Sequence, residues 1–136
     1  NGEASTAVDL AITDLYSGKC SFYKSGAAAT FIKRNQWVEV MKSTSLPIGV
    51  LREVDYESAY KKLYDGDYII MVSDGVLDVF EGENKEEELG RLLMDINTKN
   101  PKDMADELLM AVREYSGQNI MDDMTVLVTG IWQRTA

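Results

Sequence analysis

The sequence predicts an α+β fold in which antiparallel strands come first, two helices follow and one strand ends the chain. The first half holds short stretches rich in β-branched and aromatic residues with turn residues between them, which is typical of strands. From Glu86 apolar residues recur at helical spacing, and from Met124 to Trp132 strand-like residues return. Strands followed by helices favour an antiparallel α+β arrangement over a βαβ fold.

Six strands are predicted before the helices, four of them in two antiparallel hairpins. The hairpin strands are expected at residues 5–14, 20–23, 30–33 and 37–41, with turns at residues 16–19 and 34–36. Val54, Tyr56 and Tyr60 indicate another strand, and the turn Asp65-Gly66-Asp67 leads into the unbroken apolar run Tyr68–Val72. Because such a run is typical of a strand buried on both faces, we expect Tyr68–Val72, a sixth strand, at the centre of a sheet.

Two helices are predicted between Glu86 and Gly117. The first has an acidic first turn and an apolar face formed by Leu89, Leu92, Leu93 and Ile96. In the second, Asn100 suits the N-cap, Pro101 the first helical position and Gly117 the C-terminal cap. We expect the apolar residues of this second helix to pack in the core, including Met104, Leu108 and Met110.

Length and composition limit the class of protein. At 136 residues, 45% of them apolar, the chain is expected to form one domain over residues 1–136. A formal net charge of −9 argues against nucleic-acid or anionic-membrane partners, because like charges repel. No apolar run approaches the roughly 20 residues that span a bilayer, and one cysteine excludes an internal disulfide. We therefore expect no membrane contact by this segment and a cytoplasmic location, either as a cytoplasmic protein or as the cytoplasmic part of a membrane-anchored parent protein.

The absence of certain residue types and motifs excludes several catalytic mechanisms. The chain has no histidine, which excludes serine–histidine and cysteine–histidine catalysis and any zinc site with imidazole ligands. Cys20 is followed by a strand-like stretch without arginine, so we expect a buried, inert thiol. No glycine-rich phosphate loop is present, which argues against nucleotide-driven phosphoryl transfer. A hydrolytic mechanism that depends on carboxylates is compatible with the sequence.

Two acidic motifs carry the candidate chemistry. Ser73-Asp74-Gly75-Val76-Leu77-Asp78 stands where the buried strand ends and a turn is expected, and Asp122-Asp123-Met124-Thr125-Val126 stands where the last strand begins. If these strands pair antiparallel, Asp74 and Asp122 come to the same edge of the sheet, while Gly75 lets a ligand approach the backbone. At ~4 Å two carboxylates repel by about 4 kcal/mol at an effective dielectric constant near 20, so a cation or a proton must share the site.

A hard cation is the more useful occupant of such a site. Carboxylate oxygens and water suit Mg²⁺ or Mn²⁺ better than zinc or copper. Two such ions would activate a bridging water and hold phosphoryl oxygens, so that a phosphate monoester is hydrolysed without a protein nucleophile. A purely structural interpretation stands beside this one, because Asp-Gly is an ordinary turn dipeptide and the other acids would be solvated loop residues. A calcium loop at residues 65–67 is excluded by the spacing of the acids.

The two motifs, with two helices between them, resemble the C-terminal half of the PPM or PP2C-like serine/threonine phosphatases. Within that family, three further segments are most similar to the phosphatase domains of the stage II sporulation protein E of endospore formers. These segments are Ser25-Gly26, Ser45-Leu46-Pro47-Ile48-Gly49 and Gly66-Asp67. The resemblance implies a four-layer αββα sandwich of which this chain is the C-terminal part, and hydrolysis of phosphoserine with two Mn²⁺ or Mg²⁺ ions.

Carried over by motif, the resemblance makes Asp74 and Asp122 metal ligands, Asp78 a candidate ligand of a third ion, and Gly75 a point of close approach. It implies that the substrate is a phosphorylated anti-anti-sigma factor or another phosphoserine protein in sporulation control. The family's first metal-binding Asp-Gly, on an earlier strand, is absent from this chain. We therefore expect the chain alone to be weakly active or inactive, and to be completed by upstream sequence or by a second chain, for example in a homodimer.

Two functions stay open at this point. The chain is either part of such an enzyme or a catalytically silent regulatory or interaction module on the same fold, in which Asp74 and Asp122 only end strands. The chain opens directly before a strand-like run, so we expect sequence upstream of it. An Asp-Gly at the end of an early strand in that sequence would favour the enzyme.

Overall fold

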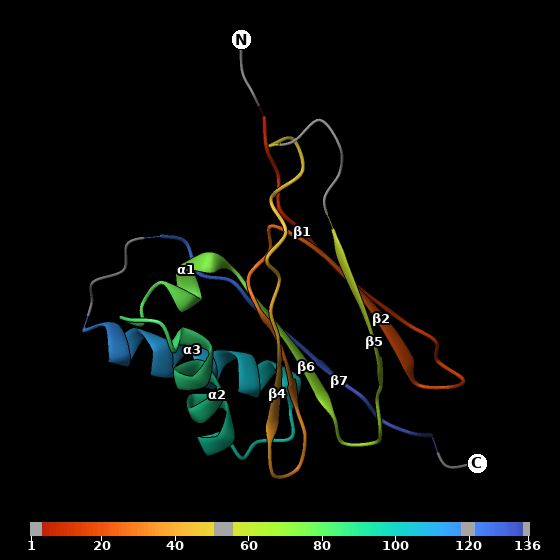
Figure 1. Ribbon diagram of the computed structural model, residues 1–136. Helices are drawn as coiled ribbons and strands as arrows, with labels where there is room; N and C mark the ends of the chain where they lie inside the picture. Colours follow the sequence, from red (N-terminus) through yellow and green to blue (C-terminus); the bar gives the residue numbers. More distant parts are fainter. Residues whose placement is uncertain (1–3, 51–55, 118–121, 135–136) are drawn as a thin grey trace. The chain divides into compact units, whose positions relative to one another are not determined.

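The computed structural model describes residues 4–50, 56–117 and 122–134, which fall into two compact units (Figure 1). The first unit takes the chain up to Ala28 together with residues 42–64, and the second takes Ala29–Met41 and the chain from Asp65 onward. Every strand pairing in both units is antiparallel, which confirms the predicted α+β class. None of the described helices has the length and apolar character that crossing a membrane requires.

A three-stranded sheet forms the first unit. Its strands are β1 (Val8–Thr13), β2 (Lys19–Ser25) and β5 (Glu57–Lys62), in the order β1-β2-β5. The predicted hairpin between β1 and β2 is confirmed, and the carboxylate of Asp14 holds its turn by accepting the backbone N–H groups of Tyr16 and Ser17. These two hydrogen bonds lower the pKa of Asp14, since they favour the charged form. Of the strand expected around residues 54–60, Val54 lies outside the described residues.

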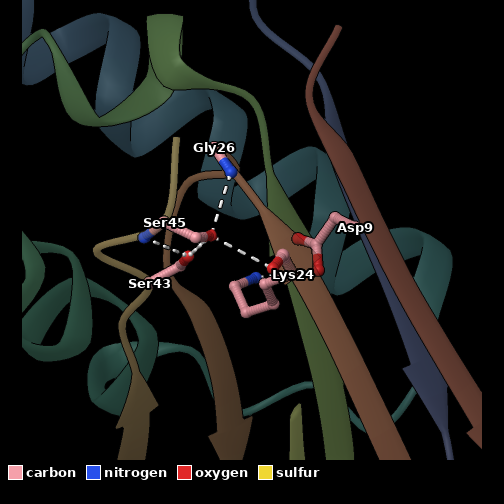
Figure 2. A network of polar contacts seen from close by, with 5 residues as sticks. All are labelled: Asp9, Lys24, Gly26, Ser43 and Ser45. Carbon is pink, nitrogen blue, oxygen red and sulfur yellow. Dashed lines mark hydrogen bonds and ion pairs between the residues drawn. The ribbon is translucent and has the colours of Figure 1, made fainter. Parts of the chain in front are cut away.

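Polar contacts attach Ser45 to the end of β2 (Figure 2). The hydroxyl of Ser45 donates to the backbone oxygen of Lys24 at 3.1 Å and accepts the backbone N–H of Gly26 at 3.3 Å. Gly26 has φ +59°, and a Cβ there would lie within 2.6 Å of the Pro47 backbone, so only glycine fits this junction. Beside it, the ammonium group of Lys24 forms an ion pair with Asp9 at 2.8 Å.

A four-stranded sheet organises the second unit. Its strands are β3 (Thr30–Lys33), β4 (Val38–Met41), β6 (Tyr68–Val72) and β7 (Val126–Gly130), in the order β4-β3-β6-β7. The prediction of a central, buried strand at Tyr68–Val72 is confirmed, because β6 lies between β3 and β7 and four of its five residues are buried. Val72 at the end of β6 pairs with Val126 at the start of β7.

Helices α2 (Lys85–Asp95) and α3 (Pro101–Ser116) pack in the second unit (Figure 1). Both were predicted, and the side chain of Asn100 caps α3 as expected. Their fully buried residues are Leu89, Leu93, Met104, Leu108 and Val112. The expectation for Met110 was wrong, since its side chain is 61% exposed. Two positions after Leu108 a helix has turned by about 200°, which places Met110 on the opposite face.

The turn expected at Asp74–Leu77 is instead a single helical turn, α1. The backbone N–H of Asp78 donates to the carbonyl of Asp74 at 2.9 Å. Val76 and Leu77 are buried and anchor this turn in the core. Four residues are too few to show a helical period, so the sequence pattern could not separate this helix from a turn.

Candidate metal centre

The two acidic motifs meet where β6 ends and β7 begins. The backbone N–H of Ser73 donates to the carbonyl of Thr125 at 3.0 Å, and the backbone N–H of Thr125 donates to the Ser73 hydroxyl at 2.8 Å. The same hydroxyl donates to the carbonyl of Asp123 at 3.3 Å. The predicted convergence of the two segments at one edge of the sheet is confirmed by these bonds and by the β6–β7 register.

Gly75 allows this approach. A Cβ at this position would collide with the backbone carbonyl oxygen of Asp123, and it would lie 3.3 Å from the carbonyl carbon of Asp122. The space that a side chain at Gly75 would occupy is thus taken by the backbone of the second motif, and the approach of a ligand to the Gly75 backbone stays a prediction. Glycine is required here because two loops of the chain pack closely.

The side chains of Asp74 and Asp122 are both exposed. Asp74 is the first residue of α1, directly after the residue that bonds to the other loop. One carboxylate oxygen of Asp122 accepts the backbone N–H of Asp123 at 2.7 Å, which fixes the carboxylate near its own backbone. Each aspartate therefore stands on a segment whose position is set by hydrogen bonds, while its carboxylate stays accessible.

Asp78 lies one helical turn after Asp74 and is also exposed. Its carboxylate accepts a hydrogen bond from the ammonium group of Lys85 at 3.3 Å, and the two form an ion pair. To bind a metal ion, Asp78 would have to exchange this partner for the ion. Its role as a ligand of a third ion stays a prediction.

The donor chemistry of these loops fits Mn²⁺ or Mg²⁺, because both ions prefer carboxylate oxygen and water. The number of donors is smaller than a complete site needs. Among the residues that the structure describes, no three histidine, cysteine, aspartate or glutamate side chains gather closely enough to hold a metal ion. Asp74 and Asp122 are therefore suited to supply part of a coordination shell, with the remaining ligands coming from water or from residues outside the described ranges.

Sequence reasoning missed Ser73 as a residue that builds the site. Its hydroxyl both donates and accepts between the two motifs, so it joins the segments that carry Asp74 and Asp122. Serine directly before a short helical turn is a frequent capping residue, and that signal was present in the sequence. The side chain makes no capping bond to α1 because its hydroxyl is used across the two loops.

The chain is similar to known proteins over nearly its whole length. The family model described as stage II sporulation protein E matches residues 1–131. The stage II sporulation protein E of Bacillus subtilis (strain 168) is 40% identical, and the alignment covers 98% of this chain and 16% of that protein. The protein of the same name from Priestia megaterium is 33% identical, with 99% of this chain and 23% of that protein covered. The chain thus spans less than a quarter of the length of either relative.

A solved structure matches both units. The manganese-presoaked phosphatase domain of the cell fate determinant SpoIIE from Bacillus subtilis superposes with a TM-score of 0.83 at 33% identity. The match covers 96% of this chain and 58% of that domain. The α+β fold with antiparallel sheets therefore corresponds to part of the known phosphatase domain.

Proposed function

Because the chain belongs to the stage II sporulation protein E family, we propose that it is part of a metal-dependent protein serine phosphatase domain. The observation that carries the proposal is the contact between the Asp74 and Asp122 segments through Ser73. It brings two oxygen-donor loops together at one edge of a rigid sheet, which is the arrangement that hydrolysis assisted by hard cations requires.

The residues of this chain would bind the metal ions and fix the two loops, and none of them would react with the phosphoryl group. Asp74 and Asp122 would bind Mn²⁺ or Mg²⁺, with Asp78 as a candidate for a further ion. When bound, such ions lower the pKa of water and neutralise charge on a phosphoryl group. Ser73 and Gly75 would keep the distance between the two loops fixed, and the buried residues Val76 and Leu77 anchor α1 behind them. No side chain of the described site is needed as a nucleophile.

The proposed substrate is a phosphoserine regulatory protein, such as a phosphorylated anti-anti-sigma factor. Family membership is what supports this substrate class. The side chains of Asp74 and Asp122 are exposed, which suits a substrate that is itself a folded protein, because no deep pocket has to admit it. A net charge of −9 disfavours the approach of a phosphorylated group, and a bound cation would reduce this repulsion.

A catalytically silent interaction module is the second candidate. Two observations favour it: no group of three metal-binding side chains occurs among the described residues, and Asp78 already pairs with Lys85. In this alternative, Asp74 and Asp122 would only terminate β6 and precede β7. The two candidates differ in one measurable property, the affinity of the complete domain for Mn²⁺.

Asp74→Asn and Asp122→Asn, introduced into the longer phosphatase domain, test the proposal. Each removes one charge with little change of shape, and we expect Mn²⁺ affinity to fall at least about tenfold, or about 1.4 kcal/mol, together with turnover of a phosphoserine peptide. Asp106→Asn is the matched control, because this exposed aspartate of α3 pairs with Lys102. Unchanged Mn²⁺ titrations and turnover in both variants would favour the silent module.

A further inference from the structure

A cavity of about 540 Å³ lies in the second unit, at the end of the sheet opposite to Asp74 and Asp122. Its walls come from the β3–β4 turn, the start of β6, the α2–α3 connection and Trp132 after β7. Tyr68 at the start of β6 lines it, whereas Asp74 follows the other end of the same strand, about 13 Å further along at ~3.3 Å per residue. Its volume falls in the range of small-molecule sites.

We propose that this cavity is a second ligand site, which binds a small organic anion with a flat ring, of the class of nucleoside monophosphates. The site is separate from the candidate metal centre and does not depend on the proposed phosphatase function. Three features of the cavity wall support the proposal. They are its basic residues, the partly buried ammonium group of Lys33 and the exposed indole of Trp132.

The wall is more basic than the chain as a whole. Three basic residues line the cavity, Lys33, Arg34 and Lys99, against two acidic ones, Asp65 and Asp67, although the chain carries 23 acidic and 14 basic residues. The guanidinium of Arg34 and the carboxylate of Asp67 are 2.9 Å apart and compensate each other. Asp65 accepts the backbone N–H of Gln133 at 2.7 Å. Glu39, outside the wall, lies 3.9 Å from Arg34, and Asp95 acts on Lys33, so Lys33 and Lys99 are the basic groups of the wall that an anion would meet.

Lys33 provides the ammonium group that an anion in the cavity would contact. Its ammonium group donates to the backbone carbonyl of Leu93 at 2.5 Å, and an ammonium carries three donors. Burial lowers the pKa of Lys33, while the nearby Asp95 acts in the opposite direction. An anion in the cavity would favour the charged form of this amine, because its negative charge compensates for the solvating water that burial removes from the ammonium group.

Trp132 offers an aromatic surface that is held in place. The indole lies over the β7 backbone at Gly130, where an added Cβ would be 2.5 Å from the ring, and it meets Tyr68 edge-on at a centroid distance of 6.4 Å. The hydroxyl of Tyr68 in turn donates to the carbonyl of Lys99 at 2.7 Å. Trp132 is nevertheless 63% exposed. A fixed, exposed indole beside lysines suits a ligand that combines a flat ring with negative charge.

Fluorescence titration of the 136-residue chain with adenosine monophosphate tests the site. The chain has two tryptophans, Trp37 and Trp132, so Trp37→Phe leaves Trp132 as the only reporter. We expect saturable quenching by the nucleotide, binding of adenosine at least about tenfold weaker, and competition by inorganic phosphate. Affinity for the nucleotide should decrease as pH rises through the lowered pKa of Lys33, because the neutral amine no longer attracts the anion.

Substitutions of the two lysines in the cavity wall test whether the nucleotide binds there. Lys33→Gln should weaken nucleotide binding at least about tenfold, and Lys99→Ala several-fold; the latter keeps the backbone carbonyl that Tyr68 uses. Lys102→Gln, outside the cavity wall, is the matched control and should bind as the parent does. The proposal is overturned if the nucleotide gives no saturable change, if adenosine binds equally well, if both lysine variants bind normally, or if Asp74→Asn abolishes binding.

Discussion

At the scale of single residues, Gly75 sets the distance between the two acidic loops. An added methyl group would collide with the Asp123 carbonyl, which is backbone and cannot rotate away. We expect Gly75→Ala to destabilise the protein by about 1–3 kcal/mol and to weaken Mn²⁺ binding of the longer domain, because the Asp122 loop must move. Thermal unfolding and Mn²⁺ titration measure the two effects.

Gly90→Ala is the matched control for Gly75. At Gly90, in the middle of α2, a Cβ would meet only the side chain of Val38 at 4.0 Å. Because alanine favours helix over glycine, this change should leave stability unchanged or raise it by up to about 1 kcal/mol. Equal stability of the two variants would contradict the close approach of the loops at Gly75.

The ion pair between Lys24 and Asp9 is expected to contribute to the free energy of unfolding (Figure 2). The Lys24 side chain is only 4% exposed, so removal of Asp9 takes the closest carboxylate from a buried charge and leaves Glu57 on the neighbouring strand as an acidic neighbour. We expect Asp9→Ala to cost about 3 kcal/mol, and the double variant Asp9→Ala/Lys24→Met to recover much of that loss. Urea unfolding gives both values.

The exposed pair Lys102–Asp106 on α3 serves as the comparison for this ion pair. Its side chains are 83% and 61% exposed, so Asp106→Ala should cost no more than about 0.5 kcal/mol. A cost for Asp9→Ala as small as that for Asp106→Ala would contradict the expectation that the buried Lys24 charge depends on Asp9.

At the scale of elements, α2 and α3 both have asparagine as the N-cap, but the two side chains form different hydrogen bonds. Asn100 accepts the backbone N–H groups of Lys102 and Asp103 at 2.9 and 3.2 Å, whereas Asn84, the N-cap of α2, makes no side-chain cap bond. We expect Asn100→Ala to destabilise the protein by about 1 kcal/mol and Asn84→Ala by much less. Urea unfolding of the two variants checks this, and equal losses would contradict the capping role of Asn100.

At the scale of the whole molecule, we expect the small number of metal-binding side chains among the described residues to limit the activity of the 136-residue chain. The chain corresponds to 58% of the solved phosphatase domain, and its described residues hold no complete group of metal-binding side chains. We expect the 136-residue chain alone to bind Mn²⁺ weakly and to turn over a phosphoserine protein at a small fraction of the rate of the longer domain. Calorimetry and phosphate release measure both, and equal rates at matched concentration would contradict the expectation.

The sequence could predict most of the elements because their signals are local. The apolar run of β6, the Asn100-Pro101 start of α3 and the turn at Asp65-Gly66-Asp67 each depend on neighbours within a few residues. It could not predict α1, which is shorter than the period that identifies a helix. It also misplaced Met110, because apolar character alone does not say on which face of a helix a residue lies.

The sequence by itself determined the order of the strands and of the two long helices, the family and the two acidic motifs, since these are properties of residue type and spacing. Tertiary structure alone decided that Ser73 bonds to both Asp123 and Thr125, that Gly75 admits the second loop, and that Asp78 pairs with Lys85. The bonds from Ser73 to Asp123 and Thr125 join residues about 50 positions apart along the chain. Their existence depends on the antiparallel register of β6 and β7, which forms only when the sheet and its core fold together.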